Sequence, residues 1–83
     1  MGRRPEIRLR NRIRVARAER ELSQSALADL AGVTRQTISA IENYQYVPSA
    51  ELAFVLAECM GKPVTEVFYL EDNDNAQPFS RGR

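Results

Sequence analysis

The stretch LSQSALADLAGVTRQTISAIEN, residues Leu22–Asn43, carries the start and stop signals of two short helices that lie close together in the chain. Ser23 is a good N-cap for the first helix, and Gly32 stands where a left-handed C-cap is expected. Thr34 is a good N-cap for the second helix. Two short helices joined by a tight turn that contains Gly form a helix-turn-helix unit, so this stretch predicts one.

The rest of the chain adds three helices to this unit. Asn11 can cap a helix that precedes the two-helix unit, and Ser49 can cap a helix that follows it. Thr65 can cap a short last helix. The expected helices are residues 11–21, 24–31, 35–43, 50–60 and 65–69. Residues 6–10 alternate apolar side chains with Arg, as a strand does, but we interpret them as extended or frayed chain. We therefore expect a compact all-α fold.

Composition excludes several classes of function. Cys59 is the only cysteine and there is no histidine, so the chain has no internal disulfide, no zinc site of the usual kind and no imidazole base. The longest apolar run, Leu52–Ala57, is far shorter than the roughly 20 residues that span a bilayer. We expect a cytoplasmic protein of one domain that is not an enzyme and has no metal, cofactor or membrane partner.

Charge is unevenly distributed along the chain. Residues 1–20 hold eight Arg and two Glu, whereas residues 21–83 have an excess of acids. A basic segment of this kind either contacts phosphates or is a solvated tail, and both interpretations stay open. The expected organisation is a basic arm at residues 1–10, a helix-turn-helix domain at 11–70 and a disordered tail at 71–83.

The second helix of the unit has an apolar face and a polar face. At about 100° per residue, Ile38 and Ile41 fall on one buried stripe. The opposite face collects side chains that are small or form hydrogen bonds, namely Arg35, Gln36, Ser39, Ala40 and Asn43. Arg can donate two hydrogen bonds to guanine, Gln can pair with adenine, and the Ala methyl can contact thymine. Many surface helices have a polar outer face, so it is the surrounding two-helix unit that favours DNA.

The residues that carry a family resemblance are Leu22–Asn43, the Pro48–Ser49 start of the next helix and the stretch GKPVTEVF at 61–68. Over residues 11–70 the chain resembles the phage-repressor family, the Cro-like or XRE-type helix-turn-helix transcriptional regulators. This resemblance implies a five-helix, lambda-repressor-like domain. It also implies double-stranded operator DNA as partner, usually bound by a homodimer at a near-palindromic site.

The resemblance also implies roles for particular residues. The base-reading positions are Arg35, Gln36, Ser39 and Ala40. The positions that contact phosphates are Gln24, Thr34, Thr37 and Asn43, although Ser39 and Asn43 can each reach base or backbone. Family members pair an Arg of the first helix with a Glu near the end of the third, and the residues at these positions are Arg17 and Glu42. The alternative is that these two are unrelated surface charges.

The chain departs from the family pattern just after the third helix. Family members commonly have Gly and then a basic residue there, whereas this chain has Tyr44 and Gln45. A phosphate contact is therefore missing from this place.

The fourth helix carries more apolar residues than its core stripe requires. The candidates for a dimer interface are Phe54, Val55, Phe68, Tyr69 and Leu70. Cyclic dimers are the commonest oligomers, but the last helix or the loop tyrosines can also cover these groups. The expected function is a sequence-specific DNA-binding regulator, a repressor or autoregulator. The alternative is an antitoxin-like protein-interaction module on the same fold, and no small-molecule ligand is evident.

Overall fold

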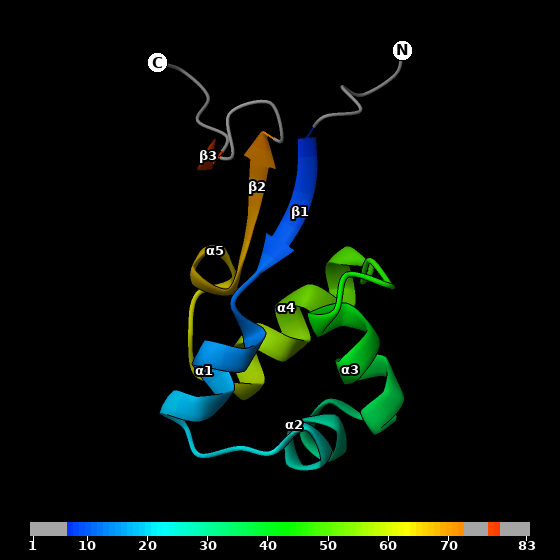
Figure 1. Cartoon of the computed structure of the whole chain (residues 1–83). Helices are drawn as coiled ribbons and strands as arrows, with labels where there is room; N and C mark the ends of the chain where they lie inside the picture. The colour runs from blue at the N-terminus through cyan, green and yellow to red at the C-terminus, as the bar shows by residue number, and fades with distance from the viewer. Residues whose placement is uncertain (1–6, 73–76, 79–83) are drawn as a thin grey trace.

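The computed structural model describes residues 7–72 and 77–78. Its described helices are α1 (Ile13–Glu19), α2 (Gln24–Ala31), α3 (Arg35–Glu42), α4 (Ala50–Cys59) and α5 (Val64–Val67). Figure 1 shows them gathered into one bundle, with α2 at the end opposite the strands. The helix-turn-helix expected from the sequence is therefore the pair α2 and α3.

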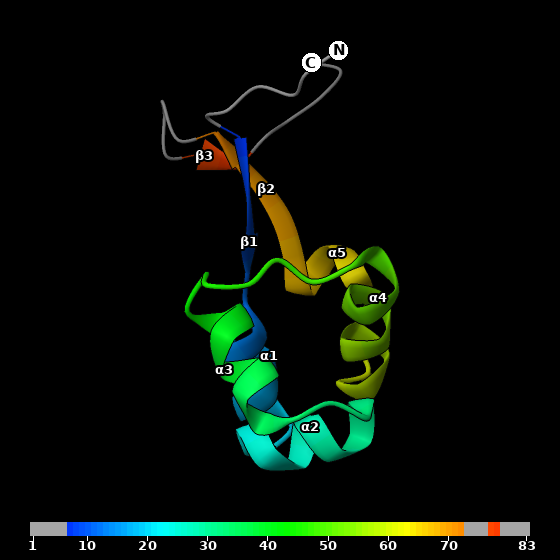
Figure 2. The ribbon, with the colours of Figure 1, turned by 90° about the vertical axis from the view of Figure 1, so that its right-hand side faces the viewer.

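Three strands accompany the helices, so the expectation of an all-α fold is wrong. β1 (Ile7–Asn11) pairs antiparallel with β2 (Phe68–Asp72), and β2 pairs with β3 (Gln77–Pro78). The strands β1 and β2 form a ribbon that extends away from the bundle (Figures 1 and 2). Its register sets Leu9 opposite Leu70, and Leu9 packs against the core. The alternation of apolar residues and Arg was a true strand signal, because a partner strand is available near the other end of the chain.

The ribbon also moves two helix boundaries. α1 begins at Ile13 instead of Asn11, because Asn11 belongs to β1 and the backbone N–H of Arg12 donates to the Val67 carbonyl at 2.7 Å. α5 begins at Val64 after Pro63, so Thr65 is not its cap. Of the expected arm and tail, residues 7–10 lie in β1, 71–72 in β2 and 77–78 in β3. Residues 1–6, 73–76 and 79–83 lie outside the described residues.

A small apolar core holds the bundle together. Each helix contributes to it, and the fully buried large side chains are Ile13, Leu27, Ile38, Ile41, Leu56, Met60 and Val67. Burying a side chain of this size stabilises the fold by about 1.5–3 kcal/mol relative to leaving it in water. Since Ile38 and Ile41 are both in this set, the core fixes which face of α3 points outward.

Candidate nucleic-acid interface

The turn between α2 and α3 has the conformation that its glycine permits. Gly32 has a φ of 77°, in the left-handed region, and a Cβ there would meet nothing within 4 Å. Conformation and not space is therefore the reason for Gly at this position. The Val33 N–H then donates to the Ala28 carbonyl at 3.0 Å, which closes the end of α2 and directs the chain into α3.

The start of α3 is capped by Thr34. Its hydroxyl accepts a hydrogen bond from the Thr37 N–H at 3.3 Å, and the two threonine hydroxyls lie 3.1 Å apart. At the other end of the helix, the Asn43 amide donates to the Ser39 hydroxyl at 3.4 Å. The helix is thus capped at its start, and a contact between side chains near its end holds Ser39 and Asn43 together.

The residues assigned to bases and phosphates lie along one accessible side of α3 and the start of α2. Arg35, Gln36, Asn43 and Thr34 are exposed, and the half-buried members of the set are Gln24, Thr37, Ser39 and Ala40. No member of this set belongs to the buried core. All of these residues are therefore accessible to some degree, and hydrogen-bond contacts join Gln24 to Arg35 and Thr34 to Thr37.

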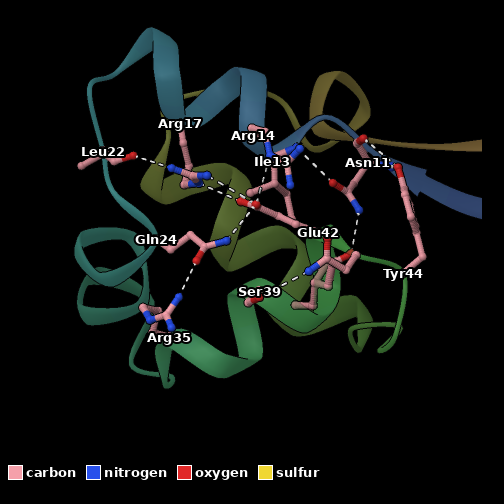
Figure 3. Close-up of polar contacts among 12 residues, drawn as sticks. Asn11, Ile13, Arg14, Arg17, Leu22, Gln24, Arg35, Ser39, Glu42 and Tyr44 are labelled. Carbon is pink, nitrogen blue, oxygen red and sulfur yellow. Dashed lines mark hydrogen bonds and ion pairs between the residues drawn. The ribbon is translucent and has the colours of Figure 1, made fainter.

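Glu42 lies at the centre of a polar network that joins α1, α2 and α3 (Figure 3). Its side chain is 1% exposed, and its Oε2 accepts from Arg17 Nε at 2.7 Å. Arg17 also donates from Nη1 to the Leu22 carbonyl at 2.8 Å. Arg17 and Glu42 are therefore a paired, buried contact between α1 and α3 and not two unrelated surface charges.

The network continues from Glu42 to the outer face through Gln24. The Gln24 amide donates from Nε2 to Glu42 Oε1 at 3.0 Å, and its Oε1 accepts from Arg35 Nη1 at 2.8 Å. Figure 3 shows the Gln24 amide between the two charged groups. Gln24 retains a second N–H, since a primary amide has two donors. The amide therefore braces Arg35 and still has a donor for an external acceptor.

The environment of Glu42 changes its pKa. Burial alone would raise the pKa, but hydrogen bonds from Arg17 and Gln24 and the charges of Arg17 and Arg14 lower it below its ordinary value. Each of these contacts favours the ionised carboxylate. At neutral pH the network is therefore built around an ionised carboxylate, with charged partners on α1 and a hydrogen-bond donor on α2.

Tyr44 has a structural role that the sequence did not reveal. It has a φ of 62°, in the left-handed region, at the place where family members commonly have Gly. Its hydroxyl lies 3.3 Å from the Asn11 carbonyl oxygen and donates to it, and Arg10 stacks over the ring at 4.1 Å. These contacts to β1 compensate the strain of the backbone. The signal was present in the sequence, because a bulky residue in place of a turn glycine needs such compensation.

The dimer candidates are divided by the fold. Phe68 is 7% exposed and belongs to the core of its own chain, because it begins β2 directly after the buried Val67. Phe54 is 62% exposed and Leu70 is 42% exposed. Val55 and Tyr69 are half-buried, and Arg12 lies over the Tyr69 ring.

Next to Leu70 is an apolar groove of about 530 Å³, between the start of α4 and the ribbon. The side chains of Leu9, Pro48, Ala53, Phe68 and Leu70 contribute to its lining. An apolar groove with an exposed leucine at its edge is suited to contact with another protein surface.

Two further observations concern the reactivity of the single cysteine and the possibility of a membrane-spanning helix. The thiol of Cys59 has a raised pKa because of burial and the nearby Glu58, which makes it a poorer nucleophile at neutral pH. No helix in residues 7–72 is long and apolar enough to cross a membrane.

Comparison with known proteins identifies the fold. A helix-turn-helix family model matches residues 13–67, from the first residue of α1 to the last residue of α5. The chain belongs to this family. The resemblance to XRE-type regulators stated from the sequence is thereby confirmed, and the matched segment contains the whole network around Glu42.

The relatives of this helix-turn-helix protein are transcriptional regulators by name. An uncharacterized helix-turn-helix-type transcriptional regulator from Methanocaldococcus jannaschii is 41% identical over 66 residues, which is 80% of this chain and 100% of the relative. The Bacillus subtilis regulator YgzD is 38% identical over the same shares of the two chains. The restriction-modification controller protein from Aeromonas hydrophila has a TM-score of 0.63 at 30% identity, and the match covers 65% of this chain and 78% of that structure.

Proposed function

We propose that this helix-turn-helix protein is a sequence-specific regulator that inserts α3 into the major groove of double-stranded DNA. The observation that carries the proposal is the outer face of α3. One side of the helix is fixed in the core by Ile38 and Ile41, and the other presents hydrogen-bonding groups to the outside. The names of the relatives support a regulator over an antitoxin-like module.

In this proposal Arg35, Gln36, Ser39 and Ala40 read base edges, with Gln24, Thr34, Thr37 and Asn43 at the phosphates. Arg35 donates to guanine O6 and N7. Its hydrogen bond to Gln24 positions it for this contact, beside the start of α3. Gln36 pairs with adenine in the same groove. The spare N–H of Gln24 meets a phosphate oxygen, so one amide serves both the backbone contact and the brace.

Two copies of the chain bind a near-palindromic operator. The apolar groove beside Leu70, with Phe54 exposed on α4, supports a homodimer that uses α4 and the ribbon. A two-fold dimer places its two α3 helices in successive turns of the groove on one side of the DNA. By occupying the operator, such a dimer acts as a repressor or autoregulator.

Selection of bound sequences from a random duplex library tests the proposal. We expect the wild-type protein to enrich one motif with two related halves. Arg35→Ala or Gln36→Ala is expected to weaken binding to that motif by about 1–3 kcal/mol and to relax the preference at one position of each half. Gln45→Ala is the matched control, since Gln45 is exposed and lies outside the proposed reading face. An absence of enrichment by the wild type would exclude the function.

A further inference from the structure

Arg14 is a charged residue on α1 that the proposed DNA contacts do not include. Its Nε lies 3.6 Å from Glu42 Oε1, whereas its side chain is 71% exposed. Arg17, one turn further along α1, has a side chain that is only 14% exposed and donates to both oxygens of Glu42. The carboxylate is therefore already satisfied without Arg14, and most of the Arg14 side chain is accessible to solvent.

Arg14 and Gln24 approach the same carboxylate oxygen of Glu42. Glu42 Oε1 accepts from Gln24 Nε2 at 3.0 Å and is the same oxygen that Arg14 approaches. The two side chains thus converge on one atom from two different helices, and Figure 3 shows both beside Glu42. The Arg14 side chain and the Gln24 amide are therefore neighbours at the edge of the network.

The charges around Glu42 favour an anion at this place. Arg14 and Arg17 bring two positive charges against one buried carboxylate, and Arg35 adds a third through Gln24. The network therefore keeps an excess of positive charge on the side of the molecule where Gln24 lies. A guanidinium also matches the oxygens of a phosphate group with two parallel donors.

We infer that Arg14 grips a DNA phosphate next to the one held by Gln24, so that α1 and α2 together form a clamp on one strand. This inference rests on the proposed DNA-binding function. Glu42 serves the clamp by holding Arg14 and Gln24 at a fixed spacing. The clamp replaces the phosphate contact that the family's basic residue supplies and that Tyr44–Gln45 lacks.

A charge-removing variant tests the clamp. The measurement is fluorescence anisotropy of the selected duplex, titrated with Arg14→Gln at salt concentrations of about 50–200 mM. Loss of one phosphate contact is expected to reduce the slope of log K against log salt by about 0.9. Sequence preference is expected to stay unchanged, because a phosphate contact carries no base information. Arg14→Lys, which keeps the charge, is expected to have a slope close to that of the wild type.

Arg20→Gln is the matched control, because it removes the same charge from α1's C-terminal end, where Arg20 lies against Gly61. We expect it to leave the slope at the wild-type value. Arg14→Ala serves as a second variant of the tested residue, and circular dichroism verifies that each variant is folded. Equal slopes for wild type, Arg14→Gln and Arg14→Ala would overturn the clamp while leaving the DNA-binding function intact. No duplex binding by the wild type would instead contradict that function.

Discussion

At the scale of single residues, Glu42 connects the helices of the candidate interface. It is a buried carboxylate with partners on two other helices, and removing it leaves Arg17 without its main partner. We expect Glu42→Ala to lower the free energy of unfolding by about 3 kcal/mol, because an uncompensated buried charge remains. Glu51→Ala, in the first turn of α4, is expected to cost less than about 1 kcal/mol. Equal melting temperatures for the two variants would contradict this role of Glu42.

The lowered pKa of Glu42 makes part of the stability depend on pH. The folded pKa lies below the ordinary value of 4.5, so the unfolded chain takes up a proton first as the pH falls. The stabilisation is therefore complete above about pH 4.5 and is lost as the pH falls through the folded pKa. We expect the stability gap between wild type and Glu42→Gln, measured by urea unfolding, to narrow below that pH. A gap that stays constant with pH would show that Glu42 titrates normally.

At the scale of elements, the sequence predicted what depends on local chemistry and missed what depends on distant pairing. The caps Ser23, Thr34 and Ser49 all accept the expected backbone N–H, since a cap acts within three residues. The ribbon was missed because β1 and β2 are near opposite ends of the chain. The outward face of α3 followed from periodicity, whereas the route from Glu42 through Gln24 to Arg35 needed the relative positions of α2 and α3.

Asn11 connects the ribbon to α3. Its side chain donates from Nδ2 to the Ile41 carbonyl at 3.0 Å and accepts from the Ile13 N–H at 3.2 Å. We expect Asn11→Ala to lower the free energy of unfolding by about 1–2 kcal/mol, because both backbone groups lose a partner. Arg8→Ala, at an exposed position of the same strand, is the control and should stay within about 0.5 kcal/mol. Chemical denaturation measures both, and equal losses would exclude a specific role for Asn11.

At the scale of the whole molecule, two faces have different tasks in the proposed regulator. The α2–α3 side is polar and carries an excess of positive charge around Glu42. The groove between α4 and the ribbon is apolar and has Leu70 at its edge. Two copies joined at this groove would leave both polar faces available for one duplex. In the proposed dimer, this apolar groove would therefore set the spacing of the DNA half-sites.

The dimer gives the last prediction. Light scattering at micromolar concentration is expected to show twice the mass of one chain for the wild type. Leu70→Glu and Phe54→Glu are each expected to show the mass of a single chain, because dimerisation would have to bury the new charge in the interface. Leu30→Glu is the control, since Leu30 is 60% exposed on α2, at the end of the molecule opposite the strands (Figure 1). The wild-type dimer should prefer half-sites about 34 Å apart, and the monomeric variants should lose this spacing preference while keeping the preference within each half. A monomeric wild type would contradict the interface, whereas a strict spacing preference in Leu70→Glu would show that the two copies meet elsewhere.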